Sequence, residues 1–214
     1  MRVMLYILLR NQRAAVGAEF ALVLPLLLIL LFGVIDGGRF LWECNEAEKA
    51  TQMGVRYAVV TDPVASALKG PADGGYSFSV SDGITQGTVV PTANFDNASC
   101  NNSTCSCAPS GGGICGAIGY DTTEFNRIAT RMAAMYAPIQ ASNVQVVYKN
   151  VGLGFAGDPD NPNVSTLVTV KLTGLTFQPL TCLVFACSIS MPDFAASLTL
   201  EDASDNGQSP PIAN

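Results

Sequence analysis

The most prominent pattern in the chain is an apolar run near its N-terminus. The residues from Phe20 to Ile35 carry no charge, and a run that begins at Ala14 is interrupted only by Glu19. At 1.5 Å per residue the longer run makes roughly 33 Å of helix, which spans a bilayer core of about 30 Å. A cleaved secretory signal has a shorter apolar region that ends in small residues, and this run lacks both features. The pattern therefore predicts a transmembrane helix at 15–36.

Helix-forming residues continue after this run, so we expect 37–61 to extend the helix and Asp62-Pro63 to stop it. If Gly37 and Gly38 do not break it, the helix is roughly 70 Å long. Small side chains recur along the extension at three- and four-residue steps, and we call them the small-residue stripe. The stripe packs against the chain's own domain or against a helix of another subunit. We favour the second, because small residues let backbones approach closely. Its members are Phe40, Cys44, Ala47, Thr51, Val55 and Ala58.

The remaining residues, 62–214, predict a separate domain of short elements. Residues 62–120 are rich in Gly, Ser, Asn and Asp, with short strand candidates at 76–80 and 88–90. Asp121 and Glu124 form a capping box that opens a helix ending at Ala137-Pro138. Alternating apolar and polar residues then predict strands at 144–151, 164–177 and 194–200. The predicted fold class is α+β: a long N-terminal transmembrane and amphipathic helix with a small antiparallel-sheet outer domain.

Charge sets the expected orientation. The first 13 residues contain Arg2, Arg10 and Arg13 and no acid, whereas 62–214 contain five basic and twelve acidic residues. By the positive-inside rule the leader, 1–14, is cytoplasmic and the C-terminal domain lies on the other side of the membrane. The net charge of −6 argues against nucleic acid as a partner.

The composition also argues against an enzyme. The chain of 214 residues has no histidine, which removes Ser-His-Asp and Cys-His catalysis and the commonest zinc ligand. No phosphate-binding loop or nucleophile-base pair is present. We therefore expect no catalytic residue, no metal and no cofactor.

Six of the seven cysteines lie in the domain beyond the helix, where an oxidising compartment favours disulfides over zinc. Cys182 and Cys187 are the most assignable pair. The other four allow three connectivities, and the sequence does not choose between them. They are Cys100, Cys105, Cys107 and Cys115.

Two acidic features have alternative explanations. Glu19 lies inside the apolar zone, where a carboxylate costs about 2.5–3.5 kcal/mol at mid-helix, so a functional role is favoured over simple contact with headgroups. The run at 158–163 offers oxygen atoms at close spacing, but it lacks the Gly and terminal Glu of an EF-hand loop. A solvated turn is therefore favoured there over a calcium site.

The segment from Arg13 to Pro25, followed by the leucine run, resembles the N-terminus of TadE-like minor pseudopilins of tight adherence (Tad/Flp) pilus systems. Gly54-Val55-Arg56-Tyr57-Ala58 is similar to the family's second block, which ends the helix. The resemblance implies that a prepilin peptidase cuts between Ala14 and Ala15 and recognises Glu19 and Phe20. Ala14 stands where the family usually has glycine.

What the resemblance implies is a minor pilin-like subunit that acts in pilus assembly, at initiation or at the tip. The implied partners are other pilin and pseudopilin subunits, the inner-membrane assembly platform, the peptidase and membrane lipid. The implied location is the bacterial inner membrane with a periplasmic C-terminal domain, which a pilus carries to the cell surface. A membrane-anchored, adhesin-like surface-binding protein is the alternative, and a periplasmic enzyme is a weaker one.

Overall fold

The computed structural model describes residues 12–158, 161–182 and 187–200, with the side chains of 12–15 left aside. Within these residues a long N-terminal helix is followed by a five-stranded antiparallel sheet, so the predicted α+β class is confirmed. The chain forms two compact units. We call the first, up to Glu43 together with Thr176–Ser190, the stem unit. The second, Cys44–Leu175 with the residues from Met191 on, is the sheet unit.

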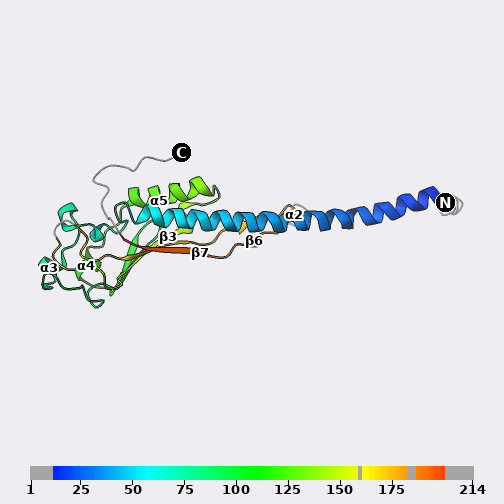
Figure 1. Cartoon of the computed structure of the whole chain (residues 1–214). Helices are drawn as coiled ribbons and strands as arrows, with labels where there is room; N and C mark the ends of the chain where they lie inside the picture. The colour runs from blue at the N-terminus through cyan, green and yellow to red at the C-terminus, as the bar shows by residue number, and fades with distance from the viewer. Residues whose placement is uncertain (1–11, 159–160, 183–186, 201–214) are drawn as a thin grey trace. The chain divides into compact units, whose positions relative to one another are not determined.

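The long helix, α2, runs without a break from Gln12 to Ala58 (Figure 1). Pro25 is inside it, and Gly37 and Gly38 continue it instead of breaking it. Its end is satisfied locally, because the Thr61 hydroxyl donates to the carbonyl of Tyr57 at 3.0 Å. The predicted helical extension is thus helical up to Ala58.

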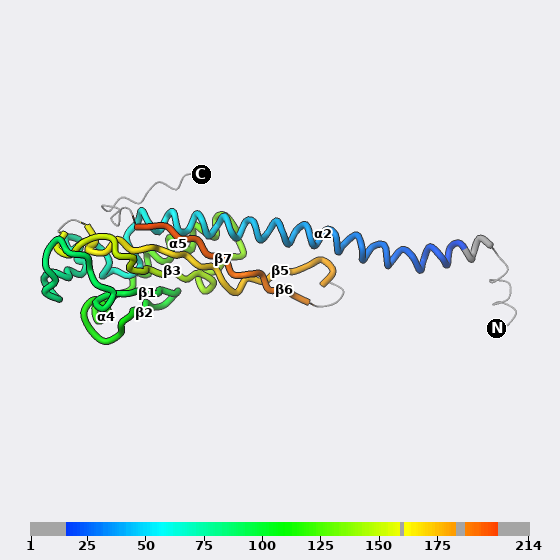
Figure 2. The backbone as a smooth tube through the Cα atoms, turned by 60° about the horizontal axis from the view of Figure 1, so that its bottom comes forward, coloured from blue at the N-terminus to red at the C-terminus, as the bar shows by residue number. Residues whose placement is uncertain are grey.

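The sheet of the sheet unit has the strand order β2-β1-β3-β4-β7, and all pairs are antiparallel (Figure 2). Alternate residues of the central strands are buried and lie opposite each other in register. Val146 of β3, for example, lies opposite Val170 of β4, and both are buried. This alternation is the pattern that predicted these strands. The strands are β1 (Asn97–Cys100), β2 (Cys105–Ala108), β3 (Val144–Lys149), β4 (Leu167–Leu172) and β7 (Phe194–Thr199).

The prediction of a single strand at 164–177 is wrong. Gly174 adopts a φ of 71°, a left-handed conformation that ends the extended chain after β4. The residues beyond it form β5 (Thr176–Phe177), which pairs with β6 (Ile189–Ser190) in a separate two-stranded sheet. This small sheet belongs to the stem unit.

The strand candidates at 76–80 and 88–90 are also wrong. Phe78 begins a short helical turn, α3 (Phe78–Ser81), and 88–90 form no strand. The Phe78 ring is buried, and its N–H donates to the Oδ1 of Asn163 at 3.1 Å, which holds the turn by a contact distant in sequence. The other short turns are η1 (Ser66–Leu68), η2 (Pro71–Asp73), α4 (Gly113–Gly116) and η3 (Ala141–Asn143).

The second long helix, α5 (Thr122–Met135), begins at the predicted residue. The Asp121 carboxylate accepts from the backbone N–H groups of Thr123 and Glu124 at 3.0 and 3.2 Å, which is the N-cap half of the predicted box. The Glu124 carboxylate pairs instead with Arg127 at 2.7 Å. The side chains of Phe125, Ile128, Ala129 and Met132 form its buried face.

Helices α2 and α5 approach closely at Gly54. A Cβ atom placed there would lie 2.7 Å from the sulfur of Met132 and 3.4 Å from a methyl group of Val170. A larger residue at Gly54 would therefore displace the Met132 side chain, so glycine allows the close packing of α2 on α5 at this point.

We expect Gly54→Ala to lower the free energy of unfolding of the sheet unit by about 1 kcal/mol. Overpacking lowers stability by roughly 1–3 kcal/mol, and the higher helix propensity of alanine offsets about 1 kcal/mol of this loss. Urea unfolding of the detergent-solubilised protein, followed by circular dichroism, measures the change. Gly37→Ala is the matched control, since nothing lies within 4 Å of a Cβ there. Equal gains in stability from both variants would contradict the packing role.

Candidate functional site

The first part of α2 presents an apolar surface on all sides. Every side chain from Val16 to Ile35 is exposed, with Leu22 at 80%. The best window of this helix has a mean hydropathy of 2.6, and none of it is buried by the rest of the chain. By length and composition the helix is able to cross a membrane. An exposed apolar surface of this extent indicates an interaction with lipid or with other apolar helices.

The structure places the residues of the expected cleavage site at the beginning of this helix. Ala14 and Ala15 lie in its first turns, and Glu19 and Phe20 follow on exposed positions. Phe20 is 64% exposed. The pair is therefore accessible on the helix surface, a short way after the polar residues 10–13.

The apolar run ends at a buried carboxylate. Asp36, which is 6% exposed, accepts from the backbone N–H of Leu180 at 2.7 Å. Its other oxygen accepts from the N–H and the hydroxyl of Thr181, both at 2.9 Å. Two main-chain donors and a side-chain donor thus converge on one carboxylate, an arrangement that satisfies a buried charge. We call this the Asp36 contact.

Aromatic and cationic side chains continue the same contact one turn later. The rings of Phe40 and Phe177 pack edge to face at 5.5 Å between centroids. The Arg39 guanidinium lies 5.3 Å from the Phe177 ring centre and forms ion pairs with Asp36 at 3.6 Å and Glu43 at 3.4 Å. These groups hold β5 and the residues that follow it to α2.

Sequence reasoning did not single out the Asp36 contact. In the sequence Asp36 marks only the end of the predicted transmembrane helix, and no pattern points to Thr181. The available signal was an acid placed directly after sixteen residues without a charge, where a charge needs partners. Its partners lie about 145 residues away in sequence, and no local pattern identifies them.

We expect Asp36→Ala to release the hairpin from α2. The amides of Leu180 and Thr181 lose their acceptor, so their hydrogen exchange becomes faster while α5 amides remain protected. Hydrogen–deuterium exchange with peptide resolution measures both regions in one experiment. Glu43→Ala, which removes a carboxylate about two turns further along the helix, is the control. Unchanged exchange at Leu180 and Thr181 in Asp36→Ala would refute the contact.

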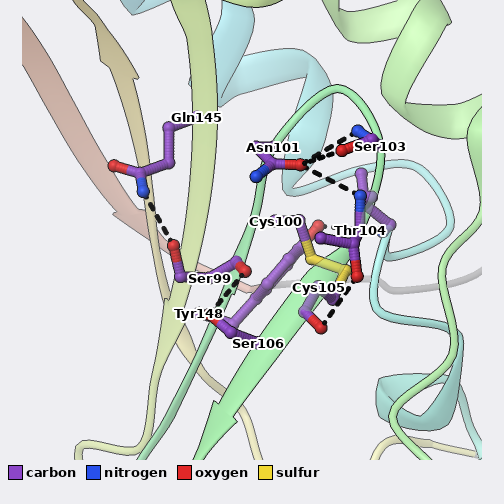
Figure 3. The surroundings of a disulfide bond; sticks show 10 residues. Ser99, Cys100, Asn101, Ser103, Thr104, Cys105, Ser106, Gln145 and Tyr148 are labelled. Carbon is purple, nitrogen blue, oxygen red and sulfur yellow. Dashed lines mark hydrogen bonds between the residues drawn. A yellow bond between two sulfur atoms is a disulfide. The ribbon is translucent and has the colours of Figure 1, made fainter.

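The structure selects one of the three connectivities that the sequence left open. Cys100 bonds to Cys105, which joins β1 to β2, and Cys107 bonds to Cys115, which joins β2 to α4. Figure 3 shows the first bond beside the turn, where the Oδ1 of Asn101 accepts from Ser103 and Thr104. In the stem unit Cys182 bonds to Cys187.

The small-residue stripe is divided between the two units. Phe40 contacts Phe177 in the stem unit, and Cys44 is half-buried. The other four members are at most 2% exposed within the sheet unit. Our preference for an interface with another subunit is wrong for these four, because the chain's own sheet unit already covers them. They are Ala47, Thr51, Val55 and Ala58.

A groove of about 610 Å³ lies between α2 and α5 in the sheet unit. Arg56, Arg127 and Arg131 are among the residues that line it, together with Tyr57. Arg56 and Tyr57 belong to the same block as Gly54, so one short sequence supplies both a packing glycine and two groove residues.

The turn at 158–163 is held by its own side chains. The Asp158 carboxylate accepts from the backbone N–H of Asn161 at 3.1 Å, and the Asn163 amide donates to the Asp158 carbonyl at 3.1 Å. Residues 159–160 lie outside the described part. Within the described part, no group of three or more His, Cys, Asp or Glu side chains is placed to hold a metal ion.

Among the described residues, one long exposed apolar helix is able by length and composition to cross a membrane, and it is joined to an antiparallel α+β unit. Residues 14–56 match the family model described as TadE-like protein, the family that the resemblance in the sequence named. The match extends from the expected cleavage site through the apolar helix to Arg56. Comparisons with curated proteins and with solved structures found no match. The family suggests a Tad pilus-associated protein, and it is a structural family not known for catalysis.

Proposed function

We propose that this chain is a minor pilin-like, or pseudopilin, subunit that acts in the assembly of a Tad pilus, at initiation or at the tip. The observation that carries the proposal is the fully exposed apolar surface of α2 between Val16 and Ile35, which lies within the TadE-like match. Pilin-like subunits need such a surface twice, first for lipid and then for neighbouring helices in an assembly.

The proposed orientation places the N-terminus in the cytoplasm of an inner membrane. Arg2, Arg10 and Arg13 precede the apolar run, which supports this orientation by the positive-inside rule. The sheet unit then lies in the periplasm, and its disulfides are compatible with that oxidising compartment. Other pilin subunits and the inner-membrane assembly platform are the proposed partners.

We further propose that a prepilin peptidase removes residues 1–14. Glu19 and Phe20 are exposed on the helix, five and six residues after Ala14, where an enzyme in the membrane reaches them. Intact-mass measurement of the membrane-extracted protein is expected to show a chain that begins at Ala15. A chain that retains Met1 in a strain with active peptidase would contradict processing.

We expect Glu19→Ala to abolish incorporation into the pilus apparatus while membrane insertion is retained. Removing a carboxylate from the apolar zone favours insertion by up to about 2.5–3.5 kcal/mol, so a loss of assembly cannot arise from weaker insertion. Membrane fractionation, surface pilus counts and co-purification with other pilins measure the separate steps. Glu48→Ala, an exposed acid on the same helix beyond the apolar run, is the control. Normal pili in a strain that lacks this chain altogether would contradict the proposed function.

A further inference from the structure

The β5–β6 hairpin is fixed to α2 at one particular level, the end of the apolar run. The three hydrogen bonds of the Asp36 contact are made by Leu180 and Thr181, which follow β5. Asp36 comes directly after Ile35, the last residue of the exposed apolar surface. From Val16 to Ile35 the helix rises roughly 30 Å, the thickness of a bilayer core. The hairpin is therefore held at the depth where hydrocarbon gives way to headgroups.

Asp36 itself is suited to that depth. An acid at the hydrocarbon border is costly when its charge is unpaired. Here both carboxylate oxygens are occupied by donors of the hairpin, and the Arg39 guanidinium is 3.6 Å away. The hairpin thus compensates the charge and lets the carboxylate lie at the border.

The stem unit also presents exposed apolar side chains around this level. Leu180 and Ile189 of the hairpin are 45% and 46% exposed, although they flank the Cys182–Cys187 disulfide that stiffens the hairpin. On α2, Leu41 and Trp42 are 64% and 65% exposed, in the turn after Phe40. Tryptophan is enriched at membrane–water interfaces, where its apolar ring and its N–H face different surroundings.

We propose that the β5–β6 hairpin is a second membrane contact, in which the side chains of Leu180 and Ile189 enter the border between headgroups and acyl chains of a phospholipid bilayer. The partner is lipid because the hairpin adjoins the end of the exposed apolar surface from Val16 to Ile35: the N–H of Leu180 donates to Asp36, the residue directly after Ile35. This inference rests on the membrane anchorage in the proposed function. Its consequence is that two segments far apart in sequence, α2 and the β5–β6 hairpin, both contact the bilayer.

Single-tryptophan variants of the full chain test this contact. Trp42 is the only tryptophan, so Trp42→Phe gives a background into which Leu180→Trp, Ile189→Trp, Leu26→Trp or Val80→Trp is introduced one at a time. Each variant is reconstituted in phosphatidylethanolamine–phosphatidylglycerol vesicles that contain phosphatidylcholine brominated near the headgroup end of its acyl chains. Leu26→Trp reports the span, and Val80→Trp, at a position 83% exposed in the sheet unit, reports water. The substituted positions are exposed, and circular dichroism verifies that each variant is folded.

We expect brominated lipid to quench Leu180→Trp or Ile189→Trp severalfold more than Val80→Trp, with blue-shifted emission. Quenching of both hairpin positions at the Val80→Trp level overturns the hairpin contact. If Leu26→Trp is still quenched in that case, the membrane anchorage of the proposed function stands and the patch faces protein or water. If Leu26→Trp is not quenched, the anchorage itself fails, and the hairpin contact fails with it.

Discussion

Replacing Tyr148 with alanine is expected to destabilise the sheet unit by about 3–5 kcal/mol, the range found for large aromatic side chains in cores. Tyr148 lies on β3 opposite Val168 and Ala98 and is fully buried. The loss is a large part of the 5–15 kcal/mol that typically separates folded from unfolded domains. Figure 3 shows the ring beside the disulfide-linked hairpin of β1 and β2, so its removal opens a cavity there.

Tyr148→Phe tests the contribution of the Tyr148 hydroxyl alone to stability. The backbone N–H of Val64 donates to this oxygen at 2.9 Å, and Val64 is itself fully buried. Phenylalanine keeps the ring and leaves that N–H without an acceptor, at an expected cost of about 1–3 kcal/mol. Lys149→Ala, an exposed change on the same strand, is the control. Urea unfolding of all three variants gives the order of their free energies of unfolding. A Tyr148→Ala protein as stable as Lys149→Ala would contradict the assignment of Tyr148 to the core.

The same residue makes the sheet unit sensitive to alkali. Burial raises the pKa of the Tyr148 phenol above its ordinary value near 10, and the hydrogen bond from Val64 offsets only part of this rise. The stabilising contribution is therefore complete below about pH 10 and is lost as the pH rises towards the folded pKa. The loss of stability above pH 10 is expected to be less steep in Tyr148→Phe, measured as the unfolding midpoint at each pH.

Ala47→Leu is expected to destabilise the sheet unit by about 1–3 kcal/mol, because Ala47 is fully buried and a larger side chain overpacks its site. The result separates the two interpretations of the small-residue stripe. Burial within the chain's own unit predicts a lower urea midpoint for the protein on its own. An interface with another subunit would leave that midpoint unchanged and impair assembly alone.

Glu48→Leu is the matched control for Ala47→Leu, since it places the same side chain on the adjacent, exposed position of α2. We expect Glu48→Leu to change the free energy of unfolding by less than about 0.5 kcal/mol. If both variants unfold at the wild-type midpoint, the four buried members of the stripe do not form a core with the sheet unit.

The elements that the sequence predicted well are those with a strong pattern of apolar residues along the chain. The apolar run and the helical extension identified α2, and alternation identified β3 and β7 near their observed limits, whereas β4 lies inside a longer predicted strand. Asp121 marked the start of α5, because an N-cap acts on the next few residues alone. In each case the signal lies within the element itself.

The elements that the sequence missed depend on distant contacts. Strands β1 and β2, Asn97–Cys100 and Cys105–Ala108, contain Asn, Ser and Cys and lack apolar alternation, yet β1 pairs with β3 and a disulfide joins it to β2. The Asp36 contact was missed for the same reason, since its donors lie at Leu180 and Thr181. The small-residue stripe was found, but the periodicity of a helix face does not show which surface covers it.

The burial of four stripe residues has a consequence for the outer half of α2. With that side occupied by the sheet unit, the positions that remain accessible between Cys44 and Ala58 are mainly polar or charged, among them Glu48, Lys49, Gln52 and Arg56. Any neighbour that meets this part of the helix meets ionic side chains. Such contacts are screened by salt over a Debye length of about 8 Å at physiological ionic strength, whereas those along the apolar half are not. Contacts that a neighbour makes with the charged half of α2 would therefore weaken as salt is added. Contacts along the apolar half would not.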